Sequence, residues 1–334
     1  MNRQLQRALN RSKDALFFPC FDSFWRRQLH GKALCLLYHR IGDNEKTKFL
    51  TSGGVPAISP LEFERELRFL KGQGADFLTF ADLRQGRLPD DSRFAVIISF
   101  DDCFRDNYTA GIEVLESLNI KGVFFQSTAF IDSKHLLWEH ELYWYTRTKE
   151  ISDKFTSLVQ EFGHRLPGVS GLHGAGLVEH LRENVPFDRL ENLLIELRQK
   201  FGEQPELTEV VDLIYPRAEQ VRRAHNLGHE IGSHGHRHLK RSNIDLSTFQ
   251  TELETSSDVL TTILGGAPSA FSYPFNSYLP DDDKVVSRHY SQAATVDRRY
   301  ICSDTSAMWI PRFSWPGPAK NSLRRSRWLL TGKI

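Results

Sequence analysis

Two groups of residues in this sequence have types and spacing that suit metal chemistry. Three histidines, His234, His236 and His238, lie within five residues. Two adjacent aspartates, Asp101 and Asp102, directly follow an apolar run. Like charges side by side are costly unless a cation lies between them or one carboxyl is protonated. The simplest alternative is that the aspartates only cap a helix and that the histidines are exposed.

A divalent metal would connect the two groups. A hydrolytic zinc site usually has three protein ligands and an open position for water. His234 and His238 are four residues apart, so they share one face of a helix or helical turn. One aspartate would complete the ligand set, and its neighbour would take a proton from the attacking water. We therefore interpret both groups as parts of one hydrolytic metal site.

The elements that must position these residues alternate between strand and helix. Strand patterns cover residues 33–41, 94–100, 122–126, 229–233, 270–275 and 291–296, and helix patterns begin after Ser59 and cover 109–118, 217–226 and 246–264. This alternation indicates a parallel α/β sheet or barrel, whose active site lies at the carboxyl ends of the strands. Residues 135–212 are mostly helical in pattern and predict a helical insertion.

With these motifs the sequence resembles the polysaccharide deacetylase family (NodB homology domain). The stretch Ser99–Cys103 is similar to the family motif T-F-D-D-G, and His234–His238 is similar to H-[ST]-x-x-H. Phe271–Asn276 matches in part a third motif, R-P-P-Y-G or Y-P-[FY]-G. The resemblance covers about residues 33–315. It implies a distorted (β/α) barrel, and a metal-dependent enzyme that removes N-acetyl or O-acetyl groups from sugars.

The resemblance also implies a role for each matching residue. Asp101 would be the general base. The metal ligands would be Asp102, His234 and His238, and the turn of Tyr273, Pro274 and Phe275 would help to hold the oxyanion. The expected metal is Zn2+, with Co2+ or Ni2+ as alternatives that accept similar ligands.

The general acid is expected near the start of the chain. Leu37-Tyr38-His39-Arg40 is similar to the first strand of a circularly permuted branch, which includes the poly-N-acetylglucosamine deacetylases and has its acid histidine there. His39 would then protonate the departing amine, which a histidine can do near neutral pH. The alternative is a structural histidine at a strand end.

Three residues depart from the family pattern. Cys103 and Asn276 replace glycines, and Ser272 stands where the R-P-P-Y-G form has the arginine that orients the catalytic aspartate. Arg312 could supply that guanidinium from another strand. We expect Cys103 to avoid positive φ and to place its thiol near the metal, where it could bind metal or be oxidised. These changes leave the expected ligands intact.

The charge distribution separates the two ends from the rest. The net charge of the 334 residues is +1, but residues 1–33 hold seven basic and two acidic side chains, and residues 312–334 hold six basic and none acidic. Basic ends favour contact with a membrane surface or an anionic partner, or they are simply solvated, and nucleic acid is not expected. We expect a basic segment 1–32, a catalytic domain 33–315 with an insertion at about 135–212, and a basic tail 316–334.

The sequence predicts a metal-dependent carbohydrate N-deacetylase. Four scattered cysteines, the lack of a signal-peptide core and the lack of a membrane-length apolar run indicate a cytoplasmic protein, peripheral at the inner membrane face. The expected substrate is an acetylated polysaccharide, oligosaccharide or lipid-linked sugar of cell-surface or exopolysaccharide biosynthesis. The alternatives are a catalytically impaired sugar-binding or assembly protein on the same fold, and a hydrolase of small non-sugar amides.

Overall fold

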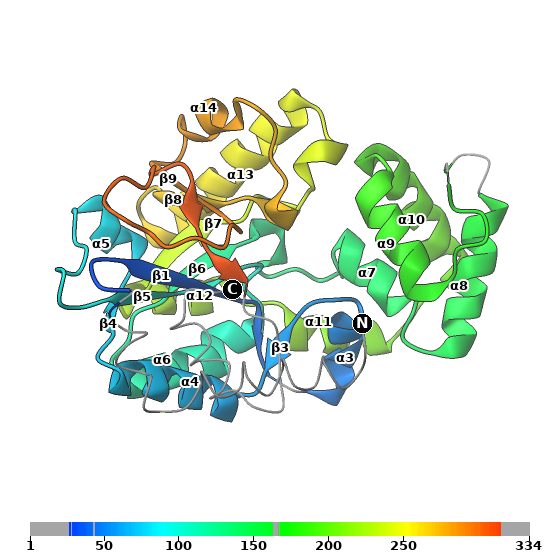
Figure 1. Cartoon of the computed structure of the whole chain (residues 1–334). Helices are drawn as coiled ribbons and strands as arrows, with labels where there is room; N and C mark the ends of the chain where they lie inside the picture. The colour runs from blue at the N-terminus through cyan, green and yellow to red at the C-terminus, as the bar shows by residue number, and fades with distance from the viewer. Residues whose placement is uncertain (1–26, 28, 43, 163–165, 167, 315–334) are drawn as a thin grey trace, which may run out of the picture.

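The computed structural model describes residues 27, 29–42, 44–162, 166 and 168–314 (Figure 1). Most of the basic segment 1–32 and all of the tail 316–334 lie outside the described residues. None of the helices in the described part of the chain combines the length and the apolar character that a bilayer crossing requires.

A curved sheet of parallel strands forms the centre of the fold. The order is β10-β9-β8-β7-β6-β5-β1-β11, and β4 also pairs with β5. The strands are β1 (Ala33–Tyr38), β4 (Asp76–Leu78), β5 (Ala95–Phe100), β6 (Val123–Gln126), β7 (Glu230–Ser233), β8 (Ala270–Ser272), β9 (Gln292–Thr295), β10 (Ile310–Pro311) and β11 (Phe313–Ser314), beside a small separate pair β2 (Arg40–Ile41) and β3 (Ala57–Ile58). Only Arg312 separates β10 from β11, although they are the two ends of the order, so the sheet must curl until its edges meet. The result is a nearly closed, distorted (β/α) barrel, as predicted.

The two faces of the curved sheet have different side chains because successive strand residues point in opposite directions. The outer face is large and apolar, with Leu36 and Ile98 packed against Phe63 and Leu67 of α4. The helices that share its cluster are α4 (Pro60–Gly72), α6 (Ile112–Ser117), α12 (Ala218–Asn226) and α13 (Leu246–Leu264). Phe80 of α5 (Phe80–Arg84) packs in the inner cluster, and Val286 of α14 (Asp282–Val286) packs in a separate one. The inner face carries mainly small residues. This leaves room inside for polar side chains at the carboxyl ends of the strands.

Helix boundaries follow local signals that the sequence shows. Ser59 caps α4 by accepting a hydrogen bond from the Glu62 N–H, and Pro60 occupies the first helical position, where no N–H is needed. Asp245 caps α13, which ends at Gly265 in the left-handed conformation. Both ends of α13 therefore lie where its sequence places them.

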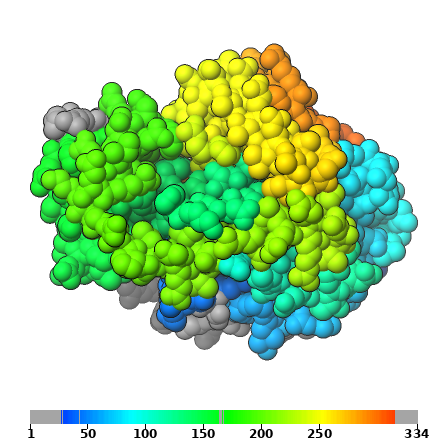
Figure 2. Space-filling view, turned by 180° about the vertical axis from the view of Figure 1, so that it is seen from behind, coloured from blue at the N-terminus to red at the C-terminus, as the bar shows by residue number. Residues whose placement is uncertain are grey.

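Five of the six α-helices that the structure describes between β6 and β7 form a lobe beside the barrel (Figures 1 and 2). They are α7 (Trp138–Trp144), α8 (Lys149–Glu161), α9 (Gly174–Asn184), α10 (Phe187–Phe201) and α11 (Glu206–Ile214). Their apolar faces share one cluster, and Phe49 and Leu50 of α3 (Lys48–Ser52) are part of it. Phe49 packs edge-on against Trp144, with ring centroids 5.2 Å apart. The segment of residues 45–56, called the early segment below, is thereby attached to the lobe.

Candidate functional site

The two aspartates diverge because the backbone turns sharply between them. Asp102 has φ +62°, and the Cys103 N–H donates to Asp101 O at 2.6 Å across it, which is the pattern of a γ-turn. The Asp101 N–H still pairs with Tyr38 O of β1, so Asp101 continues the strand. Asp102 O accepts from the Ser127 N–H at 3.2 Å. Adjacent carboxylates thus point to different positions at the end of β5.

His234 and His238 converge from a loop and not from the helix or helical turn that their spacing predicted. The loop follows β7, and His238 itself has φ +56°. The buried carboxylate of Glu252, on α13, accepts hydrogen bonds from the backbone N–H groups of His236 and Arg237 at 3.1 and 2.7 Å. Glu252 therefore replaces the hydrogen bonds that a helix would have made, and the loop can bring both imidazoles to one side.

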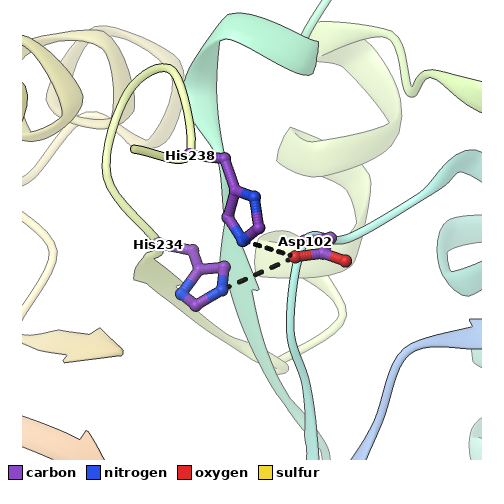
Figure 3. Close-up of side chains that lie close together, drawn as sticks. All are labelled: Asp102, His234 and His238. Carbon is purple, nitrogen blue, oxygen red and sulfur yellow. Dashed lines mark ion pairs between the residues drawn. The ribbon is translucent and has the colours of Figure 1, made fainter. Parts of the chain in front are cut away.

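Asp102, His234 and His238 form a compact group of buried ligand atoms (Figure 3). Asp102 Oδ1 lies 3.1 Å from His238 Nε2 and 3.5 Å from His234 Nε2. Ligands of a tetrahedral zinc ion at 2.0–2.1 Å are roughly 3.3 Å apart. The spacing and the N,N,O donor set therefore fit one divalent metal ion, and these residues would hold it.

Both histidines are oriented through their second ring nitrogen. His234 Nδ1 donates to Ser272 O at 2.8 Å, because a carbonyl can only accept, and His238 Nδ1 donates to Glu139 Oε1. In the neutral imidazole each Nε2 then carries the lone pair next to Asp102, which is the arrangement of metal-binding histidines; without a metal, a proton on His238 Nε2 can take the same place. Burial alone would lower the pKa of His238, but the Glu139 and Asp102 carboxylates raise it to about 10. The local charge therefore favours a cation at this point.

Asp101 is held by a guanidinium from the seam of the barrel. Arg312, fully buried, donates to Asp101 Oδ1 and Oδ2 at 2.7 Å each. Ser272 Oγ accepts from Arg312 at 2.7 Å and donates to Asp101 Oδ2 at 3.2 Å. Burial would raise the pKa of Asp101, but Arg312 and His234 lower it, so the carboxylate is ionised. Ser272 thus joins the network in which Arg312 holds the aspartate.

His39 lies on the wall of a cavity of about 290 Å³ that also contains Asp101, Asp102, His234 and His238. Its carbonyl accepts from Asn107 Nδ2 at 2.7 Å, which fixes the backbone after β1. The side-chain Nδ1 is buried and has no hydrogen-bond partner among the described residues. The structure therefore brings His39, the two aspartates and the two histidines to a single cavity.

The turn after β8 forms another part of the wall of this cavity. Tyr273 and Phe275 line it, and Phe275 has φ +57° and packs its ring on His238 with centroids 4.5 Å apart. Pro274 lies beside Gly235. Asn276 also has positive φ, and its side-chain amide pairs with Val296 N–H and O at 2.7 and 3.1 Å. Asparagine at the family's glycine position therefore fastens the turn to the end of β9.

The expectation for Cys103 is wrong in two respects. Cys103 has φ +61°, so it adopts the conformation that it was expected to avoid. Its side chain is fully buried in the apolar cluster under the outer helices, and Sγ lies 3.6 Å from Phe100 O. Burial raises the pKa of the thiol well above its usual range. The turn at Asp102 directs the thiol into the core, and it is not among the clustered ligand atoms.

Sequence reasoning missed the residues that the helical lobe contributes. Glu139 and Tyr143 of α7 and Arg182 of α9 line the cavity, together with Val55 and Pro56 from the early segment. Nothing in their spacing marks them. They lie between 15 and 52 residues from the nearest motif and reach the site only through tertiary packing. The one available signal is the concentration of aromatic residues at Trp138, Tyr143 and Trp144, which indicates helix packing first and stacking on sugar rings as the alternative.

Asp282 is buried, although the acidic run Asp281-Asp282-Asp283 is by its sequence most simply a solvated turn. It accepts a hydrogen bond from Arg241 Nε at 3.0 Å. It also accepts from the Leu279 N–H at 2.7 Å. This pair ties the loop after His238 to the helix after the Tyr273 turn. The pair does not line the cavity, so it supports the site by holding these two segments together.

A family model described as polysaccharide deacetylase matches residues 89–293. The match contains both aspartates and both histidines of the site, whereas His39 and Arg312 lie outside it. YxkH of Bacillus subtilis (strain 168), whose name is also that of a polysaccharide deacetylase, is 30% identical over 111 residues. That alignment covers 32% of this chain and 36% of YxkH. The chain thus matches about a third of the length of this curated relative.

Solved structures show the same fold at low sequence identity. Deacetylase PplD of Streptococcus pyogenes, solved with acetate, is 16% identical and aligns over 89% of this chain and 99% of its own, with a TM-score of 0.56. IcaB from Ammonifex degensii is 15% identical over 90% and 97%, with a TM-score of 0.55. A de-N-acetylase from Aggregatibacter actinomycetemcomitans is 14% identical over 88% and 99%, with a TM-score of 0.54.

The position of the first strand agrees with these relationships. β1 lies between β5 and the last strand, β11, which is consistent with the circularly permuted branch that Leu37–Arg40 resembles. The family match spans more than half of the chain and contains the clustered aspartates and histidines. This chain therefore belongs to the polysaccharide deacetylase family.

Proposed function

We propose that this protein is a metal-dependent carbohydrate N-deacetylase, which hydrolyses the acetamide of an acetylated sugar to acetate and a free amine. The observation that carries the proposal is the set of Asp102, His234 and His238 beside the Asp101–Arg312 pair in one cavity. When bound to these three residues, a divalent metal supplies Lewis acidity to the acetyl carbonyl and to a water molecule. Zn2+ is the first choice for this donor set, with Co2+ or Ni2+ as alternatives.

The protein residues would divide the proton transfers between them. Asp101, ionised and oriented by Arg312, takes a proton from the attacking water. His39, on the wall of the same cavity, donates a proton to the departing amine nitrogen. The carbonyl carbon gains an oxygen from water and loses the nitrogen, so acetate and an amino sugar are the products.

The turn after β8 offers a donor for the oxyanion. Pro274 has no N–H, the Asn276 N–H already donates to Tyr273 O, and the Tyr273 N–H points to Ala294 O. Within this turn the Phe275 N–H is therefore the candidate donor to the developing negative charge. The buried hydroxyl of Tyr273, without a hydrogen-bond partner among the described residues, is a second polar group for the substrate.

Two departures from the family pattern do not count against catalysis. The Cys103 thiol lies in the core, away from the ligand atoms, and Ser272 belongs to the network around Asp101. We therefore prefer the enzyme to the impaired sugar-binding protein and to the hydrolase of small non-sugar amides. A role in cell-surface or exopolysaccharide biosynthesis, in the cytoplasm, is part of the proposal, as is the unit 33–315 with its insertion.

The test is metal content together with acetate release. Untagged protein should bind about one zinc ion per chain, and Asp102→Ala and His234→Ala should each lose it. Asp101→Asn is the matched variant, because it should retain the metal and release no acetate from N-acetylated oligosaccharides. No bound metal after addition of zinc, or full activity of Asp101→Asn, would contradict the proposal.

A further inference from the structure

A second cavity adjoins the one that holds the ligand atoms. Its volume is about 240 Å³, and the two cavities share Gly54, Tyr143 and Arg182 on their walls. Both volumes fall at or below the lower end of the ~300–1,000 Å³ of pockets for drug-sized ligands. Each cavity is therefore suited to one sugar-sized group, and together they suit two that are joined.

The helical lobe places Tyr143 and Arg182 between the two cavities. The Tyr143 ring lies directly over Gly53, where a Cβ would come within 2.3 Å of the ring. The Tyr143 hydroxyl accepts a hydrogen bond from Arg182. Arg182 also lies over the Phe275 ring at 5.5 Å, which connects it to the wall of the first cavity. The pair is thus fixed where the two cavities meet.

Arg182 retains hydrogen-bonding capacity for a ligand. Its Nε lies 3.4 Å from Glu183 Oε1 but makes no hydrogen bond among the described residues. Glu183 is itself paired with Lys240. A guanidinium has five N–H donors, and the contacts with Tyr143 and Glu183 occupy only part of them. The remaining donors can bind hydroxyl or carbonyl oxygens of a substrate.

The charge of the second cavity selects the class of group that it can accept. Glu179 lies on its wall with Arg182, and hydroxyl groups of Ser52 and Thr146 complete the polar part. A carboxylate beside the guanidinium disfavours an anionic group such as a phosphate or a uronate. A neutral group with many hydroxyls can use both charges, because each hydroxyl both donates and accepts.

A third cavity extends the same path. It has a volume of about 470 Å³ and shares Ser52 and Thr146 with the second. The three cavities therefore form a series along the junction between the early segment and the helical lobe. A chain of sugars longer than two units can continue in this direction.

We propose that the second cavity is the binding subsite for the neutral sugar unit next to the one that is deacetylated, and that Arg182 and Glu179 are its specificity-determining residues. The proposal rests on the proposed function for the identity of the first unit. It adds that the substrate contains at least two joined sugars and that the helical lobe selects for them.

Binding of defined sugars tests the proposal independently of catalysis. The ligands are the methyl glycoside of N-acetylglucosamine and the β-1,4- and β-1,6-linked dimers of N-acetylglucosamine, titrated calorimetrically into the full-length, zinc-loaded protein. We expect at least one dimer to bind about tenfold or more tightly than the monosaccharide, since tenfold corresponds to about 1.4 kcal/mol. Glu179→Gln and Arg182→Gln should each remove most of that gain.

The matched control is Arg189→Gln, an exposed arginine of the same lobe that is not on the walls of these three cavities. This variant should keep the higher affinity for the dimer. Equal affinity of wild-type protein for monomer and both dimers, or the same gain in Glu179→Gln, would overturn the subsite, as would binding of neither sugar. Acetate release is measured separately. Tighter binding of a dimer without acetate release would contradict the proposed function but support the subsite.

Discussion

At the scale of single residues, the site depends on pairs in which one side chain orients another. Arg312 and Asp101 are an example, since the guanidinium fork matches both carboxylate oxygens. Lysine offers a single point charge and cannot reproduce this fork. We therefore expect Arg312→Lys to lower kcat by about a hundredfold through misplacement of the base, with little change in KM.

Steady-state kinetics of acetate release, beside zinc content, would check this expectation. Zinc content should be unchanged in Arg312→Lys, because Arg312 contacts Asp101 and Ser272 and none of the three ligand side chains. A variant that loses its metal would show that Arg312 supports the ligands instead. Wild-type kcat would show that the orientation of Asp101 is not limiting.

Glu139 permits a sharper comparison because Glu141, on the same helix, is a natural control. Glu139 accepts a hydrogen bond from His238, a candidate metal ligand, whereas Glu141 pairs with Arg198 and Tyr145. Loss of such a carboxylate typically costs 10- to 100-fold in metal affinity. We expect that loss for Glu139→Gln in a competition with a chromogenic chelator.

Glu141→Gln should leave zinc affinity unchanged while it lowers the melting temperature. If both variants lost affinity equally, the effect would come from general loosening of α7 and not from His238. Neither glutamate was singled out in the sequence. The candidate ligands could be named from the sequence because both motifs are local, whereas the carboxylate that orients His238 lies 99 residues away in the chain.

At the scale of elements, α13 determines the shape of the loop that carries His234 and His238. Glu252 on α13 accepts from the His236 and Arg237 N–H groups and pairs with the Arg237 side chain at 2.9 Å. In Glu252→Gln, the amide nitrogen would face one of these donors and leave it unsatisfied. We expect a loss of about 1–3 kcal/mol in unfolding free energy and weaker zinc binding.

Denaturant unfolding of the metal-free protein and a zinc titration would measure the two effects. Glu254→Gln, at an exposed position on the same helix, should change neither. Normal zinc affinity in Glu252→Gln would mean that the loop holds its shape without α13. The spacing of His234 and His238 predicted their convergence but assigned it to a helix or helical turn, because a distant carboxylate cannot be seen in a local pattern.

The junction between α3 and α7 is the second element that shapes the cavities. A Cβ at Gly53 would lie 2.3 Å from a Tyr143 ring carbon, closer than any packing allows. Gly53→Ala must therefore displace the ring, and we expect a cost of about 1–3 kcal/mol in unfolding free energy. Gly72→Ala is the control, since a Cβ there meets nothing within 4 Å.

Sugar binding would separate an effect on the wall between the cavities from a general loss of stability. If Tyr143 forms the wall between the cavities, Gly53→Ala should weaken dimer binding even below its melting temperature. Equal stability and equal binding of Gly53→Ala and wild type would contradict the position of the ring. The sequence shows a Gly-Gly pair at 53–54, but only the packed lobe reveals which of the two must lack a side chain.

At the scale of the whole molecule, the strand–helix alternation was enough to predict the barrel but not its closure. The patterns at 94–100 and 122–126 are local, so β5 and β6 could be placed within two residues of their ends. The pairing of β1 with β11 joins residues that are 277 apart, Leu36 and Phe313, and no local pattern encodes it. Such pairings position Arg312 and His39, which were the weakest parts of the predicted site.

The stability of the whole fold should also depend on pH through a buried histidine remote from the ligands. His229 is buried between β6 and β7, and its Nδ1 accepts from the Gly122 N–H at 3.1 Å. Burial lowers its pKa from 6.5 to about 4, with Glu116 opposing the shift and Lys121 adding to it. Below pH 6.5 the unfolded chain binds a proton at His229 that the folded protein does not.

The stabilisation from neutral His229 is therefore complete above about pH 6.5 and is lost as the pH falls toward 4, by about 3 kcal/mol in total. His140 and His234 have similarly lowered pKa values, so the wild-type loss is larger, and a variant must isolate the contribution of His229.

His229→Asn keeps an acceptor for the Gly122 N–H and has no group that titrates in this range. Denaturant unfolding of metal-free protein between pH 7 and 4 should give a shallower pH dependence for His229→Asn than for wild type. His225→Asn, at an exposed position on α12, should follow the wild type. Coincident curves for His229→Asn and wild type would show that the folded protein accommodates a charged His229, and that its burial between the strands does not resist protonation.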